Sequence, residues 1–211
     1  MLVDIEVKTP EIREVFPQIK EVAKQLREPV RNREYDLVIG DDFSGRIPAM
    51  IIGWGINRYY SRNGLYGIPQ RSVHKDNWRG VKDFLKNYSR GKKGLLVTES
   101  VVTGGSIREY KDICDRYGKE IDVATLTSSF DRDTYVDCYA IGEESGFFSG
   151  NIGAGHTPFY RKEHLLGIRA VQDSNGALVG KLIPYRIDNF RRAIADIEKV
   201  ANKVADILSS S

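Results

Sequence analysis

A short glycine-containing segment, Thr103 to Ser106, carries residue types that can bind a phosphate group. An apolar run over residues 95–97 precedes it and apolar residues at helical spacing follow it, so the local order is strand, loop and helix. Such a loop can turn backbone N–H groups onto an anion at the positive end of the helix, and the hydroxyl groups of Thr103 and Ser106 add donors. Glu99, at the end of the apolar run, is placed to accept hydrogen bonds from sugar hydroxyls. We therefore interpret this stretch as a cradle for a ribose 5-phosphate.

The same tetrapeptide also fits a plain structural role. Ser is a favoured N-cap residue, so Thr-Gly-Gly-Ser can be a tight turn in which Ser106 caps the following helix. The segment is neither a Walker A loop nor a GxGxxG fingerprint. Taken alone, it leaves both interpretations open.

A second segment of similar design lies upstream, at residues 40–46. It follows the apolar strand predicted over residues 35–40 and precedes a helix, and its Gly and Ser residues leave backbone amides accessible. Asp41 and Asp42 can position a hydrated magnesium ion, which takes few carboxylates beside substrate phosphates. Two anion-binding loops on one parallel sheet match a sugar that carries phosphate at one end and diphosphate at the other.

These two segments together resemble the type I phosphoribosyltransferase family. Its signature is an apolar strand, two acidic residues, two or three spacer residues and then Thr-Gly-x-Thr/Ser at the start of a helix. The resemblance runs from about Tyr35 to Gly142, roughly half of the chain. It implies an α/β fold, with a parallel-sheet core flanked by helices and a small hood subdomain. It also implies an enzyme that uses 5-phosphoribosyl 1-diphosphate, a nitrogenous base and Mg²⁺, and releases diphosphate.

The resemblance also implies a role for individual residues. Glu99 would hold the ribose hydroxyls, Arg46 would offset the charge of the departing diphosphate, and Asp41 and Asp42 would hold the metal. Residues 70–79 occupy the position of the family's flexible catalytic loop. The remaining substrate contacts would come from this segment and the two loops, namely Thr98, Val102, Thr103, Gly104, Gly105, Ser106, Asp42, Ser44, Gly45, Arg71 and Lys75.

Two positions depart from the family's pattern. Thr98 stands where the first acidic residue is expected, and its hydroxyl brings no charge to balance a cationic transition state. Val102 stands where members acting on 6-oxopurines place an aspartate, which argues against a hypoxanthine- or guanine-type enzyme. Thr98 therefore favours an alternative from another class, a non-catalytic sensor of phosphoribosyl diphosphate or a nucleotide. A purely structural protein is a third possibility, against which the intact Thr103 to Ser106 loop speaks.

Composition limits the partners and the compartment. The chain has 211 residues, 41% of them hydrophobic, which is enough for one domain with a full core. Its net charge of +3 suits a small anionic substrate, and the basic residues are dispersed among acids, so we expect no nucleic-acid partner. No apolar run reaches the ~18 residues of a membrane span and the N-terminus shows no signal-peptide pattern, so we expect a cytoplasmic protein with no membrane partner.

Family members are commonly dimers, so a homodimer is compatible with the resemblance. The two cysteines show no metal-binding spacing, and buried thiols are expected.

Hydrophobic periodicity predicts the elements that position these residues. Helices are expected over residues 10–26, 47–60, 76–90 and 187–208 and from 107 onward, and strands over 35–40, 66–73, 92–99, 121–127 and 135–141. An Asn-Gly pair at residues 175–176 predicts a hairpin within 164–182. We divide the chain into an N-terminal helical segment (1–34), the α/β core (35–142), the hood or base-binding segment (143–186) and a C-terminal helix (187–211).

Overall fold

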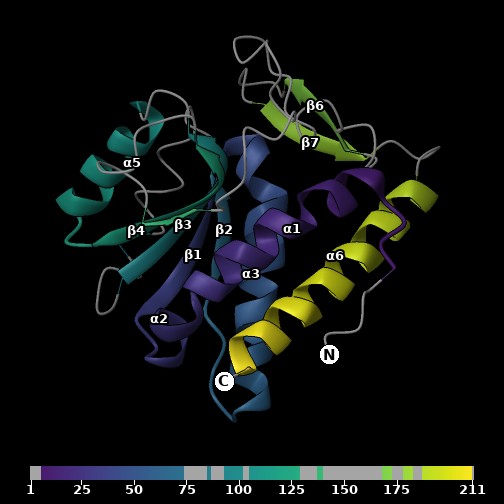
Figure 1. Ribbon diagram of the computed structural model, residues 1–211. Coiled ribbons are helices and arrows are strands. Elements are labelled where there is room, and N and C mark those ends of the chain that lie inside the picture. Colours follow the sequence, from purple (N-terminus) through teal and green to yellow (C-terminus); the bar gives the residue numbers. More distant parts are fainter. Residues whose placement is uncertain are drawn as a thin grey trace.

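A parallel sheet lies at the centre of the computed structural model, which describes residues 6–73, 85–86, 93–101, 105–128, 137–139, 168–172, 178–182 and 187–210 (Figure 1). Within these residues the sheet has five strands in the order β2-β1-β3-β4-β5, and every pairing is parallel. Their bounds are Tyr35–Asp41 (β1), Gln70–Val73 (β2), Lys93–Val101 (β3), Ile121–Ser128 (β4) and Cys138–Tyr139 (β5). The predicted α/β fold class is confirmed.

Helices cover the two faces of this sheet. On one face lie α1 (Pro10–Gln25), α3 (Asp42–Arg62) and α6 (Ile187–Ser209), whose apolar side chains share a core with Val38 and Leu95. On the other face α5 (Gly105–Arg116) packs against Leu37 and Leu96. Strand residues therefore alternate between the two cores, because successive side chains of a strand point to opposite faces. Burial on both sides explains why β1 and β3 are almost continuously apolar.

The connections that follow β1 and β3 run toward opposite edges of the sheet. β1 continues through α3 to β2 at one edge, whereas β3 continues through α5 to β4 on the other side. Right-handed crossovers of opposite direction place their helices on opposite faces, as observed for α3 and α5. The carboxyl ends of β1 and β3 thus flank a topological switch point, the position where open α/β sheets bind ligands.

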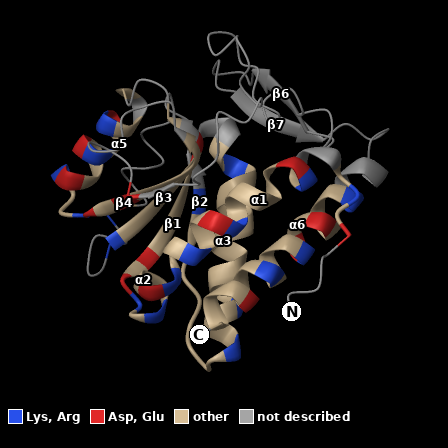
Figure 2. Cartoon of the chain, viewed as in Figure 1, with Lys and Arg blue, Asp and Glu red and all other residues tan. Residues whose placement is uncertain are grey.

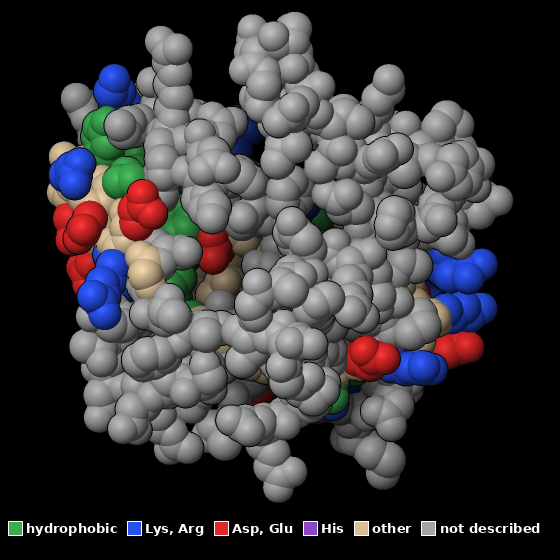
Figure 3. Space-filling view, turned by 90° about the horizontal axis from the view of Figure 1, so that it is seen from above, with side chains coloured by type: hydrophobic (Ala, Val, Ile, Leu, Met, Phe, Trp, Pro, Cys, Tyr) green, Lys and Arg blue, Asp and Glu red, His purple; other side chains and the backbone are tan. Residues whose placement is uncertain are grey.

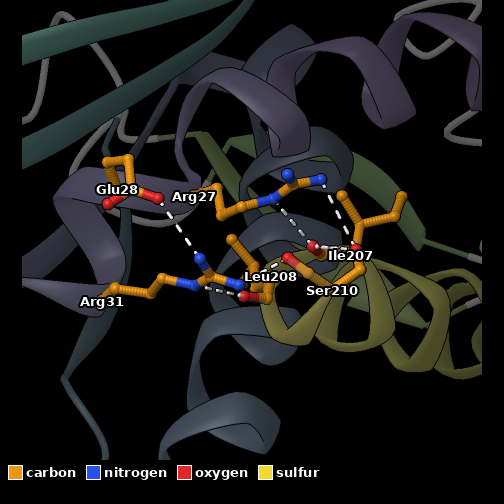
Figure 4. A network of polar contacts seen from close by, with 6 residues as sticks. All are labelled: Arg27, Glu28, Arg31, Ile207, Leu208 and Ser210. Atoms are coloured by element: carbon orange, nitrogen blue, oxygen red, sulfur yellow. Dashed lines mark hydrogen bonds and ion pairs between the residues drawn. The ribbon is translucent and has the colours of Figure 1, made fainter.

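The C-terminal helix α6 packs against α3 and against the N-terminal helices α1 and α2. A Cβ atom at Gly55 of α3 would lie 2.4 Å from Cγ1 of Val204, so the glycine allows α3 and α6 to pack closely. The short helix α2 (Arg27–Arg31) then closes the carboxyl end of α6 (Figure 4). Arg27 Nε donates to the carbonyl of Ile207 and Arg31 Nε to that of Leu208, each at 3.1 Å. These guanidinium groups satisfy carbonyls that a helix end leaves without intrahelical partners.

A buried carboxylate of α6 holds the start of α1. Asp196 is 1% exposed, and its Oδ2 accepts hydrogen bonds from the backbone N–H groups of Lys8 and Thr9, at 3.0 and 2.7 Å, and from Thr9 Oγ1 at 2.7 Å. Lys199 Nζ donates to Oδ1 at 3.3 Å. Burial alone would raise the pKa of Asp196, but the hydrogen bonds from Thr9 and Lys199 outweigh it and hold the pKa below its ordinary value.

We expect this carboxylate to make the stability of the protein sensitive to acid. Because the pKa of Asp196 is lower in the folded state, its contribution is complete above the ordinary Asp pKa of about 4 and is lost as pH falls through the folded pKa. Asp196→Asn should lower the free energy of unfolding by about 1–3 kcal/mol at pH 7 and flatten its decline between pH 5 and 3. Urea unfolding of both proteins at these pH values measures the two slopes. Equal slopes would contradict the assignment.

Several predicted boundaries differ from the structure. The helix predicted from residue 47 begins at Asp42, so the predicted polar loop over residues 41–46 is wrong. The predicted strand 66–73 begins at Gln70, because Asn57 pairs with the backbone of Ile68 and keeps the preceding residues on α3. The predicted hairpin is confirmed as antiparallel β6 (Ile168–Gln172) and β7 (Leu178–Leu182). Most of the helix predicted over 76–90 and of the strand over 135–141 lies outside the described residues.

Surface charge is mixed, as the sequence predicts. Basic and acidic residues follow one another along α1, α5 and α6 (Figure 2). The described part of the surface seen from above also carries both signs side by side (Figure 3). No helix in the described part of the chain is both long and apolar enough to cross a membrane.

Candidate functional site

Two helices begin at the carboxyl ends of two neighbouring strands. α3 starts at Asp42, directly after β1, and α5 starts at Gly105, shortly after β3 ends at Val101. β1 and β3 are paired up to Gly40 and Val97, so both helices start at the same edge of the sheet, on opposite faces. Each helix N-terminus carries a partial positive charge and N–H groups without intrahelical partners. The edge between them is therefore suited to a ligand with two anionic ends.

A side-chain hydrogen bond joins the two strand ends. Thr98 Oγ1 donates to Asp41 Oδ2 at 3.1 Å. The two residues occupy the positions that follow Gly40 and Val97 in the strand register, so they are cross-strand neighbours. Thr98 is buried and Asp41 is half-buried. The structure thus brings together one residue from each predicted loop region, although 57 positions separate them in the chain.

The predicted diphosphate loop is the first turn of α3. At Gly45 a Cβ atom would lie 2.5 Å from the carbonyl oxygen of Val97 and 3.3 Å from Cα of Thr98, so the absence of a side chain lets the helix begin directly against β3. Arg46 follows in the same turn and is half-buried. The side chains of Asp42 and Ser44 lie outside the described residues. An anion at this end would meet helix N-terminal amides rather than a loop.

Glu99 lies on the opposite side of β3 from Thr98. Val97 belongs to the core beneath α3 and Leu96 to the core beneath α5, so strand alternation places Glu99 on the α3 face and Thr98 on the α5 face. The Glu99 side chain is only 1% exposed. The backbone carbonyl of Glu99 accepts a hydrogen bond from Thr127 Oγ1 at 3.3 Å. The two residues predicted to serve the ribose therefore approach the strand end from different faces.

The predicted phosphate loop is described only in part. Gly105 is the first residue of α5 and Ser106 the second, so the alternative in which Ser106 caps the helix is wrong. Val102, Thr103 and Gly104, together with the side chain of Ser106, lie outside the described residues.

The predicted catalytic loop begins as a strand. Arg71 is exposed and lies in β2, opposite Ile39 of β1, because residues 70–73 complete the edge of the sheet. Residues 70–73 confirm this part of the strand predicted over 66–73, and the flexible loop that the resemblance implies over 70–79 is wrong for these four residues. β1 separates them from β3 in the sheet. Lys75 lies outside the described residues.

Thr125 is a buried polar residue near the site that the sequence patterns did not predict as a site residue. Thr125 of β4 is fully buried and in register with Thr98, so it extends the row formed by Asp41 and Thr98 across a third strand. Its Oγ1 donates to the carbonyl of Thr127 at 2.6 Å. A threonine inside an otherwise apolar run over residues 123–126 was the signal that could have identified it.

Two further observations concern a thiol and possible metal ligands within the described part of the chain. Cys114 is buried on α5, as expected, and burial raises the pKa of its thiol to about 12, which disfavours the reactive thiolate. The side chain of Cys138 lies outside the described residues. Among the described residues no group of three or more His, Cys, Asp or Glu side chains is arranged to hold a metal ion.

Solved structures with a similar arrangement exist, whereas sequence comparisons find no relative. No family model matches the chain, and no curated protein matches it. The crystal structure of purine phosphoribosyltransferase from Pyrococcus horikoshii Ot3 is similar over 60% of this chain and 90% of that chain, at 19% sequence identity and a TM-score of 0.38. A likeness of this degree says nothing about the reaction of this chain, which has to be inferred from its own residues.

Proposed function

We propose that this protein is a phosphoribosyltransferase that uses 5-phosphoribosyl 1-diphosphate and a nitrogenous base and releases diphosphate. The observation that carries the proposal is the pair of helix N-termini at the β1–β3 switch point. Each helix begins within one of the two segments in which the sequence pattern predicts an anion site. A ligand with phosphate at one end and diphosphate at the other would engage both helix starts at once.

The reaction would exchange one bond at the anomeric carbon of the sugar. The bond from this carbon to the diphosphate oxygen breaks, and its electron pair leaves with the diphosphate. A nitrogen lone pair of the base forms the new C–N bond, and the proton displaced from that nitrogen passes to water. The sugar carries positive charge between these events, so the protein would act mainly by positioning and by electrostatic stabilisation.

The described residues suit the diphosphate end of this substrate. The first turn of α3 can offer backbone N–H groups, and Arg46 in the same turn can offset negative charge on the leaving group. A magnesium ion bound with the substrate would neutralise further charge on the diphosphate. Magnesium keeps several waters and needs only one or two carboxylates beside phosphates, so a single acid at this helix start, Asp41 or Asp42, would be enough to hold the ion. The base would be selected by residues 143–186, the predicted hood.

A non-catalytic sensor of the same ligand is the second candidate. The observation that favours it is Thr98, a neutral and buried side chain at the position where the family pattern has an acid. Without a negative charge beside the sugar, the site would bind the substrate without stabilising a cationic transition state. The ligand would then act by shifting the protein between two conformations.

Diphosphate release distinguishes these functions. The full chain is incubated with 5-phosphoribosyl 1-diphosphate, magnesium and a panel of purine and pyrimidine bases, and released diphosphate is measured. We expect release with at least one base and loss of this release when magnesium is omitted. Tight binding in calorimetry without release for any base would favour the sensor. Absence of both binding and release would contradict both functions.

A further inference from the structure

The chemistry proposed above needs negative charge next to the sugar, and β3 supplies less of it than expected. Position 98 holds a threonine, and the Glu99 side chain belongs to the α3 face of the strand. On the α5 face, the Thr98 hydroxyl donates to a carboxylate of the neighbouring strand, that of Asp41. The negative charge that position 98 of β3 lacks is therefore carried by Asp41 on the neighbouring strand β1.

We infer that Asp41 is the carboxylate that faces the sugar in place of an acid at position 98, and that Thr98 is a positioning residue that orients it. This inference rests on the proposed binding of 5-phosphoribosyl 1-diphosphate. It separates the two acidic residues at the start of α3: Asp41 serves the sugar, and Asp42 serves the magnesium ion.

The strand register makes the substitution geometrically possible. Neighbouring strands lie about 4.8 Å apart, so a carboxylate at position 41 can extend to the space beside position 98. The hydrogen bond of 3.1 Å between Thr98 Oγ1 and Asp41 Oδ2 shows that it does so. Each carboxylate oxygen has two lone pairs, so an oxygen that accepts from Thr98 can also accept from a ligand hydroxyl.

The Asp41 side chain is supported at its base and at one of its carboxylate oxygens. Gly45 lies close to Asp41, since a Cβ atom placed on the glycine would be 3.3 Å from the Asp41 Cβ. The first turn of α3 therefore packs against the base of the Asp41 side chain, while Thr98 holds its far end. A carboxylate fixed from both ends loses little conformational entropy when a ligand binds.

Threonine at position 98 also follows from the acid at position 41. Like charges directly opposite each other on neighbouring strands are destabilising, so an aspartate at 98 beside Asp41 would repel it. A threonine avoids this repulsion and donates a hydrogen bond that an ionised acid cannot donate. Asp41 and Thr98 thus form an acid–hydroxyl pair in which the acid lies on β1 and the hydroxyl on β3.

An exchange of the two side chains tests the inference. The proteins to compare are the wild type, Asp41→Thr, Thr98→Asp and the double variant Asp41→Thr/Thr98→Asp. We expect Asp41→Thr to lower kcat about 100-fold with a smaller change in KM, as for loss of one group that stabilises transition-state charge. Thr98→Asp should also lower kcat through repulsion, whereas the double variant should recover at least tenfold over Asp41→Thr.

Conservative variants separate positioning from structural support. Thr98→Val should lower kcat about tenfold, whereas Thr98→Ser, which keeps the hydroxyl, should restore kcat to several times the value of Thr98→Val. Thermal unfolding of both variants measures whether the fold is retained. Asp206→Asn removes a surface carboxylate of α6 that pairs with Arg62 of α3, and it should leave kcat unchanged. If the wild type binds the substrate without turnover, calorimetric affinities for phosphoribosyl diphosphate with magnesium should follow the same order.

Three results would overturn the inference while leaving the proposed function intact. They are wild-type kcat and affinity in Asp41→Thr, a double variant no better than Asp41→Thr, and full recovery of Asp41→Thr at raised magnesium concentration. The last result would assign Asp41 to the metal instead of the sugar. If the wild type neither binds nor turns over phosphoribosyl diphosphate, the proposed function and this inference fail together.

Discussion

Gly45→Ala is expected to lower the affinity for 5-phosphoribosyl 1-diphosphate at least tenfold. The added methyl group would lie 2.5 Å from the carbonyl oxygen of Val97 and 3.3 Å from Cα of Thr98, so the first turn of α3 must move away from β3. This movement would displace the N–H groups that we assign to the diphosphate and would weaken the support of Asp41. Overpacking of this kind costs about 1–3 kcal/mol of stability. Calorimetry and urea unfolding measure the two effects separately.

Gly64→Ala is the matched control at the other end of α3. Gly64 has φ +67° with no atom within 4 Å of an added Cβ, so alanine there is strained by its backbone conformation alone. The expected cost is about 1 kcal/mol of stability, without a change in ligand affinity. If Gly45→Ala binds phosphoribosyl diphosphate as tightly as Gly64→Ala does, the start of α3 is not part of the site.

Local sequence patterns predicted the elements whose signals are strong and continuous. The helix starting at Pro10 and the terminal helix carry long apolar stripes, so α1 and α6 appear within one or two residues of their predicted bounds. The apolar runs at β1, β3 and β4 and the helical spacing between them were sufficient to predict a parallel sheet covered on both faces. These features depend on residues that are close together in the chain, so a single sequence is enough to predict them.

The start of α3 shows why local signals fail at the site. Residues 41–46 contain two Asp, a Ser and a Gly, which locally favour a turn. In the structure this segment is helical from Asp42, because contact with β3 at Gly45 outweighs the turn preference. Helix propensity is a weak prior that such packing overrides.

Contacts between strands also could not be predicted from the sequence. Both Asp41 and Thr98 were predicted as site residues, but their hydrogen bond depends on β1 and β3 being neighbours, which the order of the strands along the chain does not reveal. The same holds for Glu99, whose position on the α3 face follows from the register of a central strand. Residue identity therefore predicted the candidate site, and tertiary pairing determined which of its members act together.

Lys119→Met is expected to lower the free energy of unfolding by about 3 kcal/mol without changing ligand affinity. The ammonium group of Lys119 lies 2.5 and 2.6 Å from the two carboxylate oxygens of Asp36, and its side chain is 1% exposed. Removing one member of a buried ion pair leaves the other charge poorly compensated, which typically costs about 3–5 kcal/mol. The lower end of this range applies because the Asp36 side chain keeps 27% exposure. Urea unfolding and calorimetry with phosphoribosyl diphosphate measure both quantities.

Lys93→Met provides the comparison for an exposed ion pair. Lys93 is 34% exposed and pairs with the exposed Glu120 at 3.1 Å and with Asp122 at 3.3 Å, so solvent screens its charge and its removal should cost about 1 kcal/mol or less. Both lysines lie near the amino ends of the strands, because Asp36 is the second residue of β1 and Lys93 the first residue of β3. Affinity should therefore be unchanged in both variants, since the proposed site lies at the carboxyl ends. Equal losses of stability would show that burial adds nothing to the Lys119 pair. A loss of affinity in Lys119→Met alone would mean that the ligand site extends through the sheet to its opposite edge.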